Sequence, residues 1–509
     1  MKNSSPSSTP ESPLAEDSRP HAVVIGAGFG GLAAAVRLGA RGYRVTVLEH
    51  RDAPGGRAYV YERDGFSFDG GPTVITAPFL FEELWELAGK KLSDDVEMRA
   101  VDPFYRIRFH DGQSFDYSGD PDRMRAEVAR FSPGDVEGYE RFVEMSERIF
   151  RVGFQELAHV DFSSWWDMAR IVPDMMRLQS FKTVWSLVAD YVKDDRLRQV
   201  LSFHPLLVGG NPFDTTSIYS LIAFLERRWG VHYPVGGTAS LVRGLVKLVE
   251  GQGGSFRYGA TVRRILTEGR RATGVELANG ERVSCSVLVS NADSAETYRT
   301  LLAPESRSRW TDRKIERARY SMSLFVWYFG TNRKYEDVAH HTILLGPRYR
   351  GLLDDIFDKK VLAEDFSLYL HRPTATDPSV APPGCEGFYV LSPVPNLEGK
   401  TDWTTEAEPY RKRIEQFLAK TVLPDLPQHI VSQHVSTPLY FRDTLLSFRG
   451  AAFGLEPVLT QSAYFRPHNK SEELDNLFLV GAGTHPGAGV PGVLSSARVL
   501  DRLVPDARR

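Results

Sequence analysis

The segment VVIGAGFGGLAAAVRLGARGYRVTVLEH, from Val23 to His50, constrains the fold of this chain more than any other stretch. It consists of an apolar run, a turn with the spacing Gly-x-Gly-x-x-Gly, a run rich in Ala, and a second apolar run that ends at Glu49. This order predicts a strand, a tight turn, a helix and a second strand parallel to the first. We therefore expect a parallel sheet with a helix N-terminus at its edge.

The glycines of this turn have separate expected roles. Gly26 permits the tight turn, Gly28 has no Cβ to block a pyrophosphate, and Gly31 lets the helix pack close to the strand. Free N–H groups and about half a positive charge at the helix N-terminus stabilise phosphates. Glu49 ends the second strand, where an acidic side chain accepts hydrogen bonds from ribose hydroxyls. The alternative is a tight turn without a ligand, and the motif alone does not separate NAD from FAD.

Two further low-bulk segments follow the second strand. RDAPGGRAY contains Gly56 and Arg57, where the backbone can approach a ligand and a guanidinium can reach a phosphate or a flavin edge. An ordinary loop with a surface arginine is the alternative. FDGGPTVI contains Gly71, Pro72 and Thr73, and we expect it to line the same cofactor.

The C-terminal segment LVGAGTHPGAGVPGVLSSARV again places a glycine-rich turn before a helix of small residues. A flavin that accepts hydride develops negative charge at one end of its ring, so a helix N-terminus aimed there stabilises the reduced form. An ordinary glycine-rich loop is the alternative. Two such units at opposite ends of one chain favour a long cofactor, FAD. The predicted contacts here are Gly483, Gly489, Val490 and Pro491.

Periodicity divides the 509 residues into zones. We expect a leader at 1–20, a discontinuous FAD-binding domain from 21–80, 233–300 and 455–509, a mainly helical region at 85–232 and a substrate domain at 300–454. Asn279-Gly280 predicts a hairpin. Val262 and Asp293 of the middle zone are also expected to contact the cofactor.

Composition excludes several classes of function. The net charge of -3 gives no general attraction to nucleic acid. Cys285 and Cys385 have no metal-like spacing. His340 and His341 lack a third ligand nearby in sequence, so a solvated loop is favoured over a metal site, and no metal is expected. His204 is expected to be a core or channel-wall residue. No uncharged stretch is long enough to span a bilayer.

Nearly the whole chain, from about His21 to the C-terminal helix, resembles the bacterial single-enzyme, FAD-dependent phytoene desaturases. The resemblance rests on the opening glycine segment, on LLVGGNPFDTTSIYSLIAFLERRWGVHYPVGGTASLVRGL, on AEDFSLYLH and on FRPHNKSEELDNLFLVGAGTHPGAGVPGV. It implies an enzyme that converts phytoene, a C40 hydrocarbon, into lycopene or a less desaturated carotene. It also implies a cytoplasmic location at the inner face of the cell membrane. The Ser- and Pro-rich leader departs from the pattern but touches no motif.

The implied fold is α/β, with a Rossmann-like FAD-binding domain of the glutathione reductase and amine oxidase type. A sheet-containing substrate domain and a helical, membrane-facing region complete it. A hydrocarbon substrate requires an apolar channel rather than a hydrolytic constellation. A quinone or oxygen is expected to accept the electrons, and the oligomeric state stays open.

The resemblance also points to an Asp and an Arg three residues apart near the flavin. WWDMAR supplies Asp167 and Arg170 at that place, on one face of a predicted helix. Asp167 would take the proton that leaves the substrate after hydride removal, with Arg170 holding the carboxylate. An exposed helical ion pair is the alternative.

The region around this pair is rich in Trp, Met and basic residues, including Trp165, Trp166, Met175, Met176 and Trp185. Such a composition suits a membrane interface, and it suits a helical core equally. Two other functions stay open as alternatives. One is another carotenoid desaturase or isomerase of the same flavoprotein superfamily, and the other is a non-catalytic prenyl-chain escort protein on the same fold.

Overall fold

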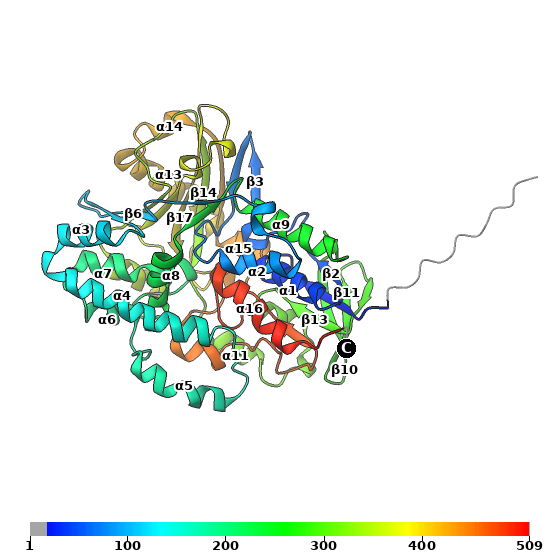
Figure 1. Cartoon of the computed structure of the whole chain (residues 1–509). Helices are drawn as coiled ribbons and strands as arrows, with labels where there is room; N and C mark the ends of the chain where they lie inside the picture. Colours follow the sequence, from blue (N-terminus) through cyan, green and yellow to red (C-terminus); the bar gives the residue numbers. More distant parts are fainter. Residues whose placement is uncertain (1–17, 508–509) are drawn as a thin grey trace, which may run out of the picture.

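Strands from both ends and the middle of the chain form one parallel sheet. The computed structural model describes residues 18–507, so residues 1–17 of the expected leader lie outside it (Figure 1). The sheet has five strands in the order β19-β13-β1-β2-β9, and every neighbouring pair is parallel. Its strands are β1 (His21–Ile25), β2 (Arg44–Leu48), β9 (Ser255–Arg257), β13 (Val287–Ser290) and β19 (Leu477–Leu479).

Both faces of this sheet are covered, which explains why its strands are nearly continuous apolar runs. Ala22 and Val24 of β1 pack into a helical layer, whereas Val23 and Ile25 pack into the core on the opposite face. Helix α1 packs against α16, α9 and α2, and Figure 1 shows α1 and α16 side by side. The helices of this layer are α1 (Phe29–Ala40), α2 (Phe79–Leu87), α9 (Thr238–Gly251) and α16 (Val490–Leu503).

A three-stranded antiparallel sheet covers the other face. The expected hairpin at Asn279-Gly280 is confirmed: β11 and β12 pair antiparallel, and Gly280 has φ +87°. The strands are β10 (Val262–Glu268), β11 (Arg271–Leu277) and β12 (Arg282–Ser284).

A second, mixed sheet of seven strands has the order β18-β14-β17-β16-β15-β6-β7. Strands β6 and β7 come from the 85–232 zone, which was expected to be mainly helical. They form a hairpin with Asp111 and Gly112 in its turn, and β6 pairs parallel to β15. The strands are β6 (Tyr105–Arg108), β7 (Ser114–Tyr117), β14 (Ser323–Thr331), β15 (His341–Leu344), β16 (Leu368–His371), β17 (Glu386–Val394) and β18 (Ile430–Ser436).

Two further sheets have two antiparallel strands each: β3 (Val60–Arg63) with β4 (Phe66–Asp69), and β5 (Met98–Ala100) with β8 (His232–Pro234). Helices α3 to α8 gather on one side of the seven-stranded sheet, and α5 lies at the outer edge of the molecule (Figure 1). Their bounds are α3 (Pro121–Phe131), α4 (Val136–Phe150), α5 (Trp165–Arg177), α6 (Val184–Ala189), α7 (Asp195–Ser202) and α8 (Leu221–Trp229).

Helix α13 covers the face of β14 and β17 that points away from this group. The remaining helices are α10 (Ser294–Glu296), α11 (Asp312–Arg317), α12 (Tyr349–Asp354), α13 (Trp403–Thr421), α14 (Leu426–His429) and α15 (Pro438–Asp443). Among residues 18–507, no helix has both the length and the apolar character needed to cross a bilayer.

A substitution of Gly31 tests the packing between α1 and β1 directly. A Cβ at this position would lie 2.0 Å from the carbonyl oxygen of Gly26. Gly31→Ala should therefore destabilise the protein by about 1–3 kcal/mol through overpacking, measured by urea denaturation followed by circular dichroism. Gly251→Ala, at the exposed end of α9 with no atom within 4 Å of the added Cβ, is the matched control. Equal stability of the two variants would contradict the close packing.

Candidate active site

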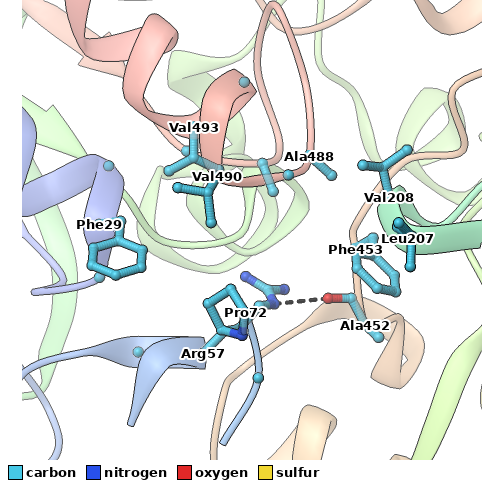
Figure 2. Close-up of a pocket in the computed structure, with 18 of the residues that line it drawn as sticks. Phe29, Arg57, Pro72, Leu207, Val208, Ala452, Phe453, Ala488, Val490 and Val493 are labelled. Atoms are coloured by element: carbon cyan, nitrogen blue, oxygen red, sulfur yellow. Dashed lines mark hydrogen bonds between the residues drawn. The ribbon is translucent and has the colours of Figure 1, made fainter. Parts of the chain in front are cut away.

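A large, mainly apolar cavity lies between the five-stranded and the seven-stranded sheets. Figure 2 shows part of it, with Arg57 and Pro72 facing Val490 and Ala488 across the space. Glycines gather at one end of this cavity, and large apolar side chains line the other. The glycines in the lining are Gly26, Gly28, Gly30, Gly55, Gly56, Gly70, Gly71, Gly153, Gly481, Gly489 and Gly492.

The N-terminal glycine turn opens into this cavity. Gly26 has φ +90°, and Gly28 is the N-cap of α1 with no side-chain hydrogen bond to the first turn. The first N–H groups of a helix have no partner within the helix. They are therefore available to an anion at this position. Gly31, in contrast, is absent from the lining and faces the Gly26 carbonyl, so it packs the helix on the strand.

Asn291 is a site residue that sequence analysis missed. It follows β13 and lies between the two glycine turns: a Cβ at Gly28 would be 2.9 Å from its Nδ2. Added Cβ atoms at Gly30 and Gly481 would be 2.5 Å and 2.6 Å from its Oδ1. A polar residue at the carboxyl end of a parallel strand next to β1 was the available signal, but the strand order had to be known to use it.

Glu49 is held at the end of β2 by the turn itself. Its carboxylate accepts hydrogen bonds from the backbone N–H groups of Ala27 (2.8 Å) and Arg51 (3.0 Å), and the ring of His50 lies 2.9 Å away. Burial alone raises the pKa of Glu49, but the hydrogen bonds from His50, Arg51 and Ala27 outweigh this and hold it below its ordinary value. Glu49 therefore carries a charge at neutral pH, as an acceptor for ribose hydroxyls requires.

Arg57 lines the cavity and is not a surface charge. Its Nε donates to the carbonyl of Ala452 (2.7 Å; Figure 2) and its Nη2 to the hydroxyl of Ser447 (2.9 Å). Burial lowers the pKa of Arg57, and the nearby Asp293 opposes this shift. Asp293 also lines the cavity and caps α10 through the N–H of Ala295 (2.8 Å). Burial raises the pKa of Asp293, with Arg57 acting in the opposite direction.

The C-terminal turn places a second helix N-terminus at the cavity. Gly489 is the N-cap of α16 with φ +92°, and Val490 and Pro491 form its first turn. All three line the cavity. Gly483 is not among the lining residues, because the chain there packs on α10: an added Cβ would lie 2.8 Å from the Cβ of Ser294. Its expected cofactor contact stays a prediction.

Thr73 joins the glycine end of the cavity to the seven-stranded sheet. Its hydroxyl is 2.7 Å from the hydroxyl of Tyr389 and 3.0 Å from that of Tyr369. Tyr389 also donates to the carbonyl of Gly71 (3.3 Å). Pro72 and Val262 lie in the lining as well. The polar network therefore fixes the 70–73 segment against β16 and β17.

The apolar part of the cavity contains a buried carboxylate that sequence analysis also missed. Glu226 of α8 is fully buried and lines the cavity. Tyr105 donates to its Oε1 (2.6 Å), and Nε2 of His204 is 3.1 Å from its Oε2. Burial and the neighbouring Glu226 raise the pKa of Tyr105 well above its ordinary value, so the phenol stays protonated. His204, 1% exposed, is a core residue as expected.

Asp167 and Arg170 are not among the lining residues. Asp167 occupies the third position of α5, where its Oδ2 accepts from the N–H of Ser164 (3.2 Å) in a capping box. Within residues 18–507, the ion pairs do not include one between Asp167 and Arg170, and Arg170 is exposed. The local sequence Ser-x-x-Asp explains this placement. The catalytic role of the pair stays a prediction.

The expectation of a solvated loop at His340 and His341 is wrong. These side chains are 5% and 0% exposed, and both lie beside His371. Burial and the neighbouring rings lower the pKa of both histidines well below its ordinary value. The sequence did not indicate His371 as their neighbour, because it lies thirty positions after His341 and is brought beside it by the pairing of β15 with β16.

Comparisons with known proteins agree with this geometry. A family model described as flavin containing amine oxidoreductase matches residues 29–499. The chain is 50% identical over 493 residues to the neurosporene-forming phytoene desaturase of Cereibacter sphaeroides, covering 96% of this chain and 95% of that protein. It is 51% identical over 482 residues to the lycopene-forming phytoene desaturase of Pantoea ananas, covering 94% and 98%. The chain belongs to the bacterial phytoene desaturase family.

Family membership confirms the resemblance seen in the sequence and the flavoprotein class of oxidoreductase. The fold is also similar to that of a solved structure with little sequence identity: putrescine oxidase bound to putrescine superposes with a TM-score of 0.64 at 13% identity, covering 95% of this chain and 98% of that one. The residues present fit a flavin dinucleotide, because the N-caps of α1 and α16, Gly28 and Gly489, line the same cavity as the Glu49 carboxylate.

Proposed function

We propose that this chain is an FAD-dependent phytoene desaturase that forms lycopene or a less desaturated carotene such as neurosporene. The observation that carries the proposal is a single cavity whose glycine-rich end fits a dinucleotide and whose apolar end fits a hydrocarbon. The names of the relatives from Cereibacter sphaeroides and Pantoea ananas support phytoene as the substrate. When bound, the flavin accepts a hydride from an allylic carbon of the substrate.

The chain's own residues have defined parts in this reaction. The N-termini of α1 and α16 would stabilise the negatively charged parts of a bound flavin dinucleotide. Glu49 would accept hydrogen bonds from ribose, and Arg57 holds the wall of the cavity through Ala452 and Ser447. Apolar side chains such as Leu207 and Phe453 line the cavity. They exclude water and surround the polyene with apolar groups. A quinone or oxygen would serve as the terminal electron acceptor.

Expression in a phytoene-accumulating host tests the whole proposal. Coloured carotenes identified by chromatography support desaturation and distinguish lycopene from neurosporene. A changed geometric isomer with no new double bond would favour a flavin-dependent isomerase. Bound phytoene without turnover in purified protein would favour an escort protein.

Glu49→Ala tests the FAD site. Loss of charge-assisted hydrogen bonds worth about 1.5–3 kcal/mol should weaken FAD binding about tenfold to a hundredfold. The measurement is the ratio of flavin to protein absorbance after gel filtration. Glu82→Ala removes an exposed carboxylate from α2 and is the control. Equal flavin retention in both variants would show that Glu49 does not contribute to FAD binding.

We also propose that α5 lies on a membrane surface and passes the substrate to the cavity. Trp165, Trp166 and Met176 are 61%, 71% and 61% exposed. Ile171 of the same helix lines the cavity. An exposed apolar outer face and a cavity-lining inner face suit a lipid-dissolved substrate. Trp185 does not belong to this surface, because its ring packs on Phe213 at 4.7 Å.

Changing Trp165 and Trp166 together to Ser should move the protein from pelleted liposomes to the supernatant with its flavin content unchanged. The expected cause is the loss of apolar area that the interface would bury. A Val361→Ser, Val431→Ser double variant, which removes side chains 47% and 50% exposed elsewhere, is the control. Pelleting of both variants like the parent would place the membrane surface elsewhere.

The proton that leaves the substrate needs an acceptor, and the placement of Glu226 in the cavity favours this carboxylate. General-base catalysis is typically worth about 10² to 10⁴ in rate. Glu226→Gln should lower carotene formation in liposomes by about a hundredfold or more at unchanged flavin content. Asp167→Asn tests the role that the family resemblance assigns to Asp167. A slow Asp167 variant with a fast Glu226 variant would return the role to Asp167, and parent rates in both would assign the proton to water or to the flavin.

A further inference from the structure

Three histidines converge in the core behind the cavity wall. His340, His341 and His371 are 5%, 0% and 1% exposed. One ring nitrogen from each lies within 4.8 Å of the others. His341 and His371 are directly paired residues of β15 and β16. The chain bends at His340, so its ring turns to the same side as that of His341, with 4.4 Å between the ring centroids. Strand alternation, which would point adjacent rings apart, does not apply here.

The hydrogen bonds of the cluster leave nitrogen atoms free on its inner side. Nδ1 of His340 is 2.6 Å from the hydroxyl of Thr376, and Nδ1 of His341 is 2.6 Å from the hydroxyl of Tyr369. Nε2 of both residues and both ring nitrogens of His371 are buried without a hydrogen-bond partner. A buried polar atom without a hydrogen-bond partner destabilises the folded protein. One such nitrogen from each of the three rings indicates an occupant that they bind.

The surroundings supply the second layer of contacts that histidine metal ligands have in known sites. There, one ring nitrogen binds the ion while the other bonds to an oxygen that fixes the ring. Thr376 and Tyr369 are such oxygens for His340 and His341. Oδ2 of Asp69 is 3.9 Å from Nε2 of His371, and Oδ1 is anchored by the N–H (2.7 Å) and hydroxyl (2.8 Å) of Thr238. This carboxylate provides the negative charge that a divalent cation needs.

We propose that His340, His341 and His371 bind one divalent transition-metal ion of the zinc class. Imidazole nitrogens suit zinc, which they bind at about 2.0–2.1 Å. One ion that binds all three nitrogens at that distance requires the rings to move closer together than their present separation of up to 4.8 Å. The site is closed by Tyr233 and Tyr389, whose rings lie 4.9 Å from His340 and 4.8 Å from His371. Its role is therefore structural.

The ion would stabilise the wall of the cavity. Tyr369 contacts His341 on one side and Thr73 on the other. An ion on His341 thus fixes the hydroxyl network that holds the 70–73 segment at the glycine end of the cavity. The ion takes no part in hydride or proton transfer.

Metal analysis of the flavin-loaded enzyme, purified without a polyhistidine tag, tests the site. We expect about one equivalent of zinc per chain in the parent and at least about tenfold less in His340→Gln and in His371→Asn, since each loses one of three ligands. His434→Asn removes a half-buried imidazole outside the cluster and should keep the zinc of the parent.

The unfolding temperature of the parent provides a second test that does not require the variants to fold. Parent stripped with a chelator should unfold at a lower temperature, and added zinc chloride should restore the original midpoint, because an ion that binds only the folded state stabilises it. A parent that holds less than about a tenth of an equivalent of zinc and does not respond to added zinc would overturn the proposal. The cluster would then hold an ordered water only.

Discussion

Close backbone contact at the carboxyl edge of the parallel sheet is the constraint on which the rest of the structure depends. Gly28, Gly30 and Gly481 surround the side chain of Asn291, and any Cβ at these positions would lie less than 3.0 Å from it. This contact lets α1 and α16, which lie more than four hundred residues apart in sequence, start at the same edge. Their free N–H groups consequently face one cavity. There, one helix N-terminus can bind the charged middle of a cofactor and the other can bind its electron-accepting end.

The second sheet turns that edge into an enclosed site. Thr73 bonds to Tyr369 and Tyr389, and Arg57 bonds to Ala452 and Ser447, so the glycine-rich segments after β2 are fixed to the other half of the molecule. The space that remains is lined largely by apolar side chains. Since a hydrocarbon has no polar group to recognise, shape and exclusion of water must provide the selectivity. The buried histidine cluster lies directly behind this shared wall.

Part of the site was predictable because its determinants are local. The Gly26 turn, α1 and Glu49 lie within one strand-helix-strand unit, in which spacing alone sets the geometry. The same holds for the Asn279-Gly280 hairpin. Ser164-x-x-Asp167 was an equally local signal of a helix cap, although the family resemblance implied a catalytic role for Asp167. Glu226 was missed because its partner Tyr105 is 121 positions away, on a strand that was expected to be helical.

The sequence by itself determined that the chain forms a parallel sheet with two glycine-rich helix starts, and its resemblance to a known family indicated flavin chemistry on a carotene. Backbone conformation at a turn or cap depends on a few neighbouring residues, so it can be read directly from the chain. Only the tertiary structure decided that Trp165 and Trp166 are exposed while Trp185 is packed, and that His371 joins His340 and His341. Burial and clustering depend on which surfaces come into contact after distant strands pair. The composition of the chain does not show which surfaces these are.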